Sequence, residues 1–160
     1  MLLARAVLAA QLAKLQKCLV SMARQDTRAR LLMSTPGVGV LVALTYVAAI
    51  DDPARFRSSK AVGAHFGLTP RKYQSGETDV TGRISKIGDG SVRTALYEAA
   101  NIILTRPVKG SPLKSWAMRV AKRSGTRKAK VALARKLAVV PHRMLADGHV
   151  FAAGNTTAKA

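Results

Sequence analysis

The stretch from residue 71 to residue 93, RKYQSGETDVTGRISKIGDGSVR, most constrains what this chain can fold into, because it carries four glycines. A glycine inside a helix costs up to about 1 kcal/mol relative to alanine. Gly76, Gly82, Gly88 and Gly90 therefore exclude a continuous helix here and predict a basic loop with a short β-hairpin. On both sides of the loop, apolar residues recur at helical spacing, and no sustained strand pattern appears. The sequence predicts a mainly α-helical fold that contains a glycine-rich basic loop.

Residues 1–27 are expected to form a coiled-coil-like helix that precedes the rest of the domain. Five apolar residues follow one another at alternating spacings of four and three, namely Leu8, Leu12, Leu15, Leu19 and Met22. This is the a/d pattern of a coiled coil, and it spans about two heptads. Two interpretations are open: the helix packs into the core of this chain, or it pairs with a second helix.

The sequence TPGVG at residues 35–39 separates a basic helix end from an apolar run at residues 40–50. This is the pattern of a helix-hairpin-helix. In such a hairpin, Gly37 and Gly39 let backbone N–H groups at the start of the second helix face a phosphate, which the helix dipole also favours. A plain tight turn between two core helices is the other interpretation.

The remaining helices are expected to begin at carboxylate or hydroxyl caps. Asp51 and Asp52 precede Pro53, and we interpret them as a helix start rather than as a metal-binding pair, because adjacent side chains diverge. Asp89 or Ser91 is expected to cap the helix that follows the glycine-rich loop. The expected helices cover residues 58–68, with Gly67 as the stop, and about 92–105, 113–122 and 127–145. The helix at 92–105 is expected to bury Leu96, Ala99, Ala100 and Ile103 as its apolar face.

The charge of the chain points to a polyanionic partner. Lysine and arginine number 27 against 8 acidic residues, which gives a formal net charge of +19. Between Glu98 and Asp147 there is no acidic residue, whereas an ordinary solvated helix face mixes both signs. Nucleic acid is the favoured partner, with a membrane surface and a basic helix surface kept soluble by its charge as the alternatives.

Cysteine content and hydropathy limit the disulfides, zinc sites and membrane spans that the chain can form. Cys18 is the single cysteine, which excludes an intrachain disulfide and a cysteine-based zinc site and fits a reducing cytoplasm. The longest apolar run, residues 38–50, is shorter than the roughly 20 residues of a bilayer span. No membrane-spanning segment is therefore expected, and nucleic acid rather than a membrane is taken as the partner.

Ser75 is the candidate nucleophile of the glycine-rich loop. A serine can attack a phosphodiester when cations neutralise the phosphate, and arginine binds phosphate oxygens with a planar, permanently charged fork. The cations near Ser75 in sequence are Arg71, Lys72, Arg83, Lys86 and Arg93. Ser-Gly is also a common turn dipeptide, and basic loops bind phosphate without reacting. The acidic residues are too dispersed to predict a metal site.

An ordered series of motifs extends beyond this loop. It comprises TPGVG (35–39), SSKAVGAHFGLTP (58–70), QSG (74–76), GRISKIGD (82–89), VRTALYEAA (92–100) and ARKLAVVPHRMLADG (134–148). Over about residues 28–151 the chain resembles the C-terminal transposase domain of one bacterial insertion-sequence family, the recombinases guided by a bridge RNA.

The resemblance implies a mechanism and a set of partners. Ser75 matches the serine of the family's Ser-Gly motif, which joins covalently to DNA, while residues 80–86 and Arg93 match the basic segment expected to contact DNA or RNA. In the family, an N-terminal RNase H-like domain supplies metal-binding carboxylates. DNA, a guide RNA and further transposase subunits, identical or full-length, are the implied partners, in the cytoplasm and at the nucleoid of a bacterium. Residues 1–27 match the family's helical connector, and residues 152–160 are expected to be a disordered tail.

Two features depart from the family pattern. The carboxylate domain is absent from this sequence, so we expect a truncated copy that is inactive alone, with no cofactor in this chain and Mg²⁺ needed only with the missing domain. Pro141 stands inside the last expected helix, where an interior proline costs about 3 kcal/mol and kinks the helix. A non-catalytic nucleic-acid-binding remnant or a modulator of full-length transposase is the alternative. The ordered motifs argue against a DNA-repair or ribosome-associated protein.

Overall fold

The computed structural model describes residues 2–75, 77–107 and 111–152, which form seven α-helices, one 3₁₀ helix and one two-stranded hairpin. Their order is α1 (Leu2–Gln25), α2 (Thr27–Met33), α3 (Val40–Ile50), η1 (Pro53–Arg55), α4 (Ser59–His65), β1 (Pro70–Ser75), β2 (Thr78–Ile84), α5 (Gly90–Thr105), α6 (Pro112–Ser124) and α7 (Thr126–Asp147). The prediction of a mainly α-helical fold with a short hairpin is confirmed. The expected disordered tail at 152–160 lies, apart from Ala152, outside the described residues.

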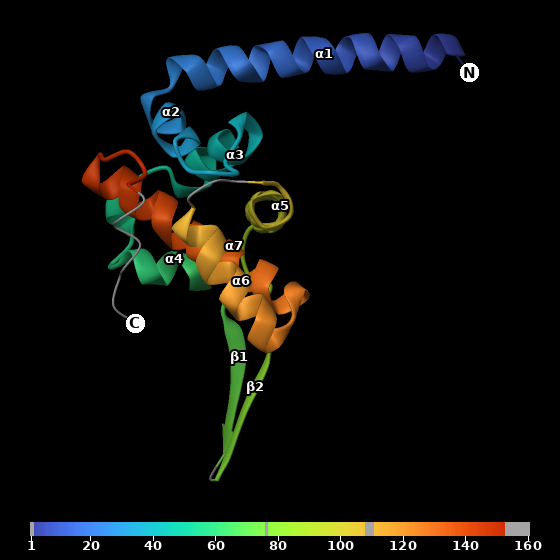
Figure 1. The fold of residues 1–160 in the computed structure, drawn as a ribbon. Helices are drawn as coiled ribbons and strands as arrows, with labels where there is room; N and C mark the ends of the chain where they lie inside the picture. Colours follow the sequence, from blue (N-terminus) through green and yellow to red (C-terminus); the bar gives the residue numbers. More distant parts are fainter. Residues whose placement is uncertain (1, 76, 108–110, 153–160) are drawn as a thin grey trace.

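Helix α1 extends away from the other helices and meets α2 and α3 only at its C-terminal end (Figure 1). Near that end Ala23 is buried, whereas Leu8, Leu12 and Leu15 are 69%, 57% and 63% exposed. The interpretation of this seam as a core helix is therefore wrong for most of its length. Pairing of the seam with a second helix stays a prediction. The chain turns into α2 at Asp26, whose carboxylate accepts a hydrogen bond from the Arg28 N–H.

The hydrophobic core forms where α7 crosses α4, α5 and α6, with α3 packed on α5. Helix α5 begins at the predicted cap, because the Asp89 carboxylate accepts hydrogen bonds from the backbone N–H groups of Ser91 at 2.7 Å and Val92 at 3.2 Å. The predicted apolar face of α5 is buried, with Leu96, Ala99, Ala100 and Ile103 at most 1% exposed. Burying a leucine or isoleucine contributes about 1.5–3 kcal/mol each.

The predicted turn between α2 and α3 is confirmed, and its first glycine is needed for packing. Gly37 has a left-handed backbone with φ of 81°, and a Cβ at this position would lie 2.6 Å from the Ile103 Cγ1 atom on α5. Any side chain here would push α5 away from the turn. Thr35, in the same turn, is buried and lies with its hydroxyl 3.2 Å from the Met144 sulfur of α7.

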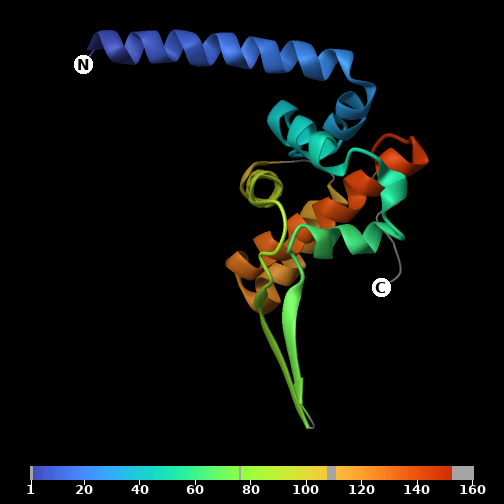
Figure 2. The same ribbon diagram turned by 180° about the vertical axis from the view of Figure 1, so that it is seen from behind.

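The predicted stop of α4 at Gly67 is confirmed. The chain turns there through a left-handed backbone, with φ of 65°, and leads into the hairpin. The backbone that follows β2 crosses directly over Gly67, where a Cβ would clash with Ile87. The Lys86 N–H donates to the Gly67 carbonyl at 3.0 Å, and the Ser85 N–H donates to the Thr69 carbonyl at 2.9 Å. The two ends of the hairpin are thereby tied to each other in the segment that directly follows α4. Beyond this base, β1 and β2 project from the helices as an arm (Figure 1, Figure 2).

Asp52 caps a helix start as predicted, although the element is the short 3₁₀ helix η1. The Asp52 carboxylate accepts a hydrogen bond from the Ala54 N–H at 2.8 Å. η1 is held to α7 by His142, whose Nε2 lies 3.1 Å from the Pro53 carbonyl oxygen and whose Nδ1 lies 2.9 Å from the Ser59 Oγ. Because a carbonyl only accepts, Nε2 carries the proton and Nδ1 accepts from the serine hydroxyl.

Helix α7 runs through Pro141, and Tyr46 of α3 bonds to the helix backbone on both sides of the proline. The buried Tyr46 hydroxyl donates to the Ala138 carbonyl and accepts a hydrogen bond from the His142 backbone. These two groups would otherwise bond to each other across one helical turn. Insertion of a side chain is a recognised way to accommodate a proline within a helix. Burial raises the pKa of the Tyr46 phenol, partly opposed by the His142 hydrogen bond.

We predict that Tyr46→Phe lowers the free energy of unfolding by about 1–3 kcal/mol, because it leaves buried backbone groups without a partner. Pro141→Leu should raise stability, but by less than the roughly 3 kcal/mol proline penalty, because Tyr46 already satisfies part of the ladder. The cost of Tyr46→Phe should be smaller in the Pro141→Leu background, where α7 can close on itself. Urea unfolding of the four proteins tests this coupling, and strictly additive effects would contradict it.

We predict a loss of stability below about pH 6.5 that depends on His142. Burial lowers the pKa of His142, while the Pro53 carbonyl and Asp147 oppose this shift. A histidine whose folded pKa lies below its unfolded value of about 6.5 contributes stability that is complete above pH 6.5 and is lost as the pH falls toward the folded pKa. His142→Gln should make the melting temperature less dependent on pH between about pH 5 and 6.5. An unchanged pH profile would contradict this role for His142.

Candidate nucleic-acid interface

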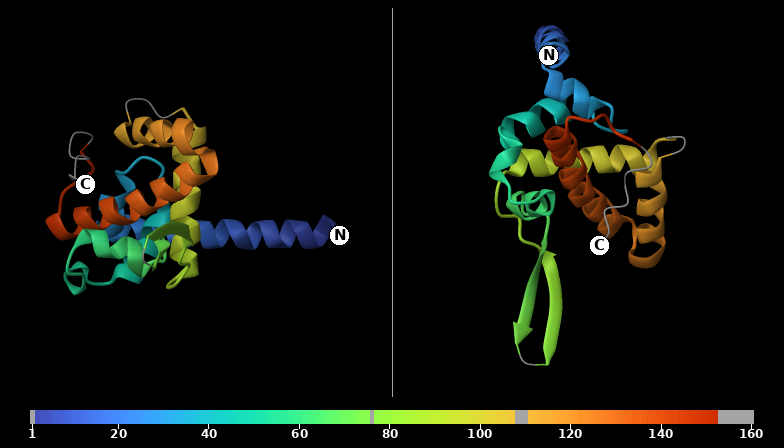
Figure 3. Two further views of the ribbon diagram at one scale, coloured as in Figure 1. Left: turned by 90° about the horizontal axis from the view of Figure 1, so that it is seen from below. Right: turned by 90° about the vertical axis from the view of Figure 1, so that its left-hand side faces the viewer.

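Ser75 lies at the tip of the hairpin arm, as the last residue of β1, and is exposed. It pairs with Thr78 across the hairpin, at the end farthest from the helices (Figure 3, right). Its neighbour in the Ser-Gly motif, Gly76, lies outside the described residues. An exposed hydroxyl on a projecting tip can approach a phosphate without a rearrangement of the fold.

The cations predicted to surround Ser75 lie instead along the arm and at its base. Arg71 sits at an irregularity in the pairing of β1, about four residues and therefore roughly 13 Å from Ser75 along the strand. Lys72 pairs with Thr81, and strand alternation places it on the opposite face of the hairpin from Ser75. The arrangement within this chain does not bring these charges together at the hydroxyl.

Two of the predicted contacts are also engaged by backbone carbonyls. The Arg71 guanidinium donates to the Ser85 carbonyl at 3.2 Å. The Arg93 Nη1 donates to the Phe66 carbonyl at 3.0 Å and approaches the Gly88 and Asp89 carbonyls at 3.4 Å. Arg93 therefore holds the return of the hairpin against α4 and α5. Lys72, Arg83 and Lys86 are exposed.

The two glycines of the PGVG turn have different surroundings. Gly37 faces Ile103 in the core and presents little of itself to a ligand. Gly39 is exposed, precedes the first turn of α3, and has open space at the position of a Cβ. This turn lies beside α2 and α3, away from the arm (Figure 1). The predicted site residues thus occupy two separate regions of the molecule.

A groove of about 1310 Å³ runs along one face of α7 and was not predicted from the sequence. Helix α4 and the base of the arm border α7 on one side, and α6 lies on the other (Figure 3). Helix α7 lines the groove with five basic residues, Arg127, Lys128, Arg135, Lys136 and Arg143. The border adds Lys60, Arg83 and Lys86, and Asp147 is the acidic residue of the lining.

The sequence contained a signal for this groove. On α7, the pairs Arg127-Lys128 and Arg135-Lys136 alternate with the apolar pairs Val131-Ala132 and Val139-Val140. Successive pairs are four residues apart, which places all of them on one helix face. The lack of acidic residues in this segment was noted, but the helical alternation of basic and apolar pairs was missed.

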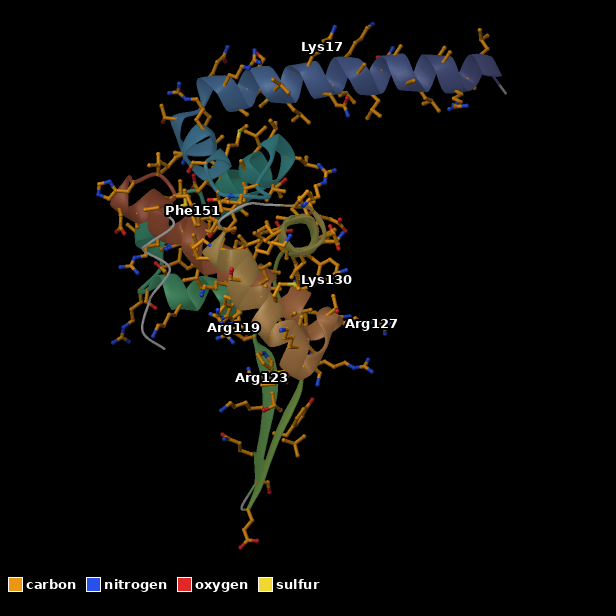
Figure 4. All side chains as sticks on the ribbon, in the orientation of Figure 1. Lys17, Arg119, Arg123, Arg127, Lys130 and Phe151 are labelled. Carbon is orange, nitrogen blue, oxygen red and sulfur yellow. The ribbon has the colours of Figure 1, made fainter. Side chains whose placement is uncertain are left out.

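The positive charge of this region is weakly compensated within the chain. Among the described residues, the ion pairs are Arg28 with Asp26 and Arg143 with Asp147, both on the surface. The Lys136 Nζ lies 4.5 Å from the centre of the Trp116 ring of α6. Burial and the nearby positive charge of Arg119 lower the pKa of Lys136. Figure 4 shows Arg119, Arg123 and Arg127 at the end of the helical body from which the arm projects.

Neither a metal site nor a membrane span is found in the described part of the chain. Within residues 2–75, 77–107 and 111–152, no three His, Cys, Asp or Glu side chains are grouped so that they can hold a metal ion. None of the helices described there combines the length and the apolar character needed to cross a bilayer. The interface is therefore defined by cations, the Ser75 hydroxyl and the apolar floor of the groove.

The chain is similar to several bacterial transposases and to a DNA-inverting protein. It is 33% identical over 137 residues to the transposase for insertion sequence element IS1111A of Coxiella burnetii, covering 85% of this chain and 38% of that protein. It is 29% identical over 142 residues to the transposase for IS1328 of Yersinia enterocolitica, covering 88% and 42%. The pilin gene-inverting protein of Moraxella bovis is 28% identical over 126 residues, covering 78% and 38%.

These relatives are considerably longer than the present chain, which spans about two fifths of the length of each, 38% to 42%. Residues 29–113, more than half of the chain, match the model of the transposase family IS116/IS110/IS902. This segment contains the PGVG turn, the hairpin arm with Ser75, and helix α5. The chain therefore belongs to the IS116/IS110/IS902 family of transposases.

Proposed function

We propose that this chain supplies the serine nucleophile and part of the nucleic-acid-binding surface of a transposase that cuts and rejoins DNA. The observation that carries this proposal is the position of Ser75, exposed at the tip of an arm whose base is closed by backbone bonds and held to the end of α4 by Arg93. The Ser75 oxygen forms a bond to the phosphorus and gives up its proton, while a deoxyribose oxygen leaves as a hydroxyl and takes a proton. Reversal of this step on a second DNA end rejoins the strand.

The basic residues of the arm would bind phosphates that flank the reacting one. Arg71, Lys72 and Arg83 lie near the base of the arm, roughly 10–17 Å from the level of Ser75 along the strands. At that distance they orient DNA but do not neutralise the attacked phosphate. Groups that stabilise the transition state therefore come from the part of the relatives' length that this chain does not cover. The described residues do not form a carboxylate set suited to Mg²⁺, so we derive no step through a metal.

A non-catalytic binding module that modulates a longer transposase is the second candidate. The observation that favours it is the separation of Ser75 from the cations that a reacting phosphate needs. Both candidates share DNA as a partner, and a guide RNA is a further proposed partner of either. They differ in one measurable property, the formation of a covalent link between the protein and DNA.

We predict that Ser75→Ala abolishes the covalent protein–DNA adduct when the chain is joined to the N-terminal part of a full-length relative. Removal of the hydroxyl eliminates the attacking oxygen but no charge, so DNA affinity should change little. A denaturing gel of labelled DNA detects the adduct, and a titration measures binding.

Ser85→Ala serves as the matched control, because Ser85 follows the same hairpin and also carries a hydroxyl. It should leave the adduct intact. An adduct that persists in Ser75→Ala and disappears in Ser85→Ala would place the nucleophile at Ser85. An adduct formed by the 160-residue chain alone would refute our view that groups outside it are required.

We predict that DNA binding weakens steeply with salt, because lysine and arginine dominate the surface and aromatic residues make up only 4% of the chain. For about six to ten neutralised phosphates, the affinity should fall by roughly 10³ to 10⁵ between 50 and 200 mM salt. Arg83→Ala or Lys86→Ala should reduce the slope by up to about one unit if that residue contacts a phosphate. Affinity that is independent of salt would contradict backbone-directed binding.

A further inference from the structure

The groove along α7 has basic sides and an apolar floor, and neither feature belongs to the serine site. Arg127 and Lys128 are eight residues from Arg135 and Lys136, which separates the two basic pairs by about 12 Å along the helix. Between them lie Val131 and Ala132, both half-buried. A ligand that spans this face therefore meets cations and apolar surface alternately.

The floor of the groove keeps apolar surface that the core does not cover. Val131 and Val139 line the groove, are half-buried, and lie outside the cluster of hydrophobic side chains packed in and against the core. Trp116 contributes from α6, with Lys136 above its ring. An apolar strip of this kind in a chain of such high charge indicates a ligand that also carries apolar surface.

Packing holds the basic side chains of the groove in position, and among the described residues Asp147 alone of the groove lining pairs with one of them. The stem of Arg135 lies across Gly63 of α4, where a Cβ would approach its Cγ to 3.2 Å. Lys136 is held over Trp116, and burial together with the positive charge of Arg119 lowers its pKa; a bound phosphate would relieve the repulsion between the two cations. Arg143 has a partner in Asp147 at 3.4 Å.

We propose that this groove binds a single strand of DNA, with phosphates on the basic sides and bases against the apolar floor. A duplex hides its base faces and would leave the floor uncovered, whereas a single strand exposes both phosphates and bases. An acidic amphipathic helix has similar surface chemistry, but the groove continues into the arm. Residues 81–84, which belong to strand β2 of the arm, line it, and so does Lys86 just after that strand.

The assignment to DNA rests on the proposed function, in which the strand attacked at the tip of the arm is DNA. A strand bound at Ser75 can follow the arm past Arg83 to its base and enter the groove there. After cleavage, one of its ends is no longer restrained by the bond that has been broken. The groove would hold the strand next to this end and keep it near the arm until it is rejoined.

The first test compares two variants of equal charge in the Ser75→Ala chain, which cannot react. Arg127→Ala with Lys128→Ala removes two charges from the groove, and Lys17→Ala with Lys130→Ala removes two from positions outside it (Figure 4). On single-stranded DNA the groove variant should lose about 1.4 units of salt slope, about 0.7 for each phosphate contact. The control variant should lose much less. Equal losses in the two variants would overturn the proposal.

The second test concerns the floor. Trp116→Leu should weaken single-strand binding about 5- to 160-fold, the range for loss of one base stack, and leave binding of the duplex of the same sequence unchanged. Val139→Ser, a smaller change outside the core cluster, should act in the same direction if Trp116→Leu impairs folding by circular dichroism. Equal losses on single strand and duplex would refute binding of bases by the floor.

Measuring the binding of an RNA strand of the same sequence distinguishes a groove for DNA from a groove for RNA. RNA bound more tightly than DNA, with the same dependence on the groove residues, would overturn the assignment to DNA. If no groove variant alters single-strand binding, the strand does not bind in the groove, and the proposal is overturned. If groove-dependent binding is found but no adduct forms at Ser75, the proposed catalytic function fails and the groove assignment stands.

Discussion

Helix α7 must bury one face in the core although it belongs to a segment without a single acidic residue before Asp147. Its core face is made of small and medium apolar side chains, Ala129, Leu133, Ala134, Leu137 and Ala138, spaced by one helical turn. Helices α4, α5 and α6 pack against it. The lysines and arginines are thereby confined to the remaining surface of α7, and they become concentrated where the groove lies.

The packing of α7 also determines how its proline is tolerated. Pro141 removes a backbone donor, and a helix interrupted in the core would normally expose carbonyl groups to an apolar environment. Tyr46 supplies both a donor and an acceptor from α3 at this point. His142, the next residue, ties the same segment to η1 and α4. The proline segment is therefore an anchoring point between α7 and its neighbours.

Much of the fold follows from local chemistry that a sequence displays. The carboxylate caps at Asp52 and Asp89, the stop at Gly67 and the apolar face of α5 depend on residues close together in the chain, and all were predicted. The partners of Gly37, Tyr46 and Arg93 are distant in sequence, so periodicity does not reveal them. The same reason explains the groove, because α4, the arm and α6 come together only in the folded chain. The roles of Ser75 and of the basic residues of the arm stay predictions, since they depend on DNA and on protein outside this chain.

The arm and the groove place different demands on the structure, and the base of the hairpin meets both. A projecting two-stranded ribbon has few contacts of its own and depends on its base for orientation. Here the backbone bonds from Ser85 and Lys86, together with the Arg93 guanidinium, fix that base against α4. Residues 81–84 and Lys86 also form one border of the groove, so a ligand that reaches this border contacts the segment that orients the tip. A strand in the groove would thus stabilise the hairpin base, and through it the direction of the arm, which couples strand binding to the position of Ser75 without a separate moving element.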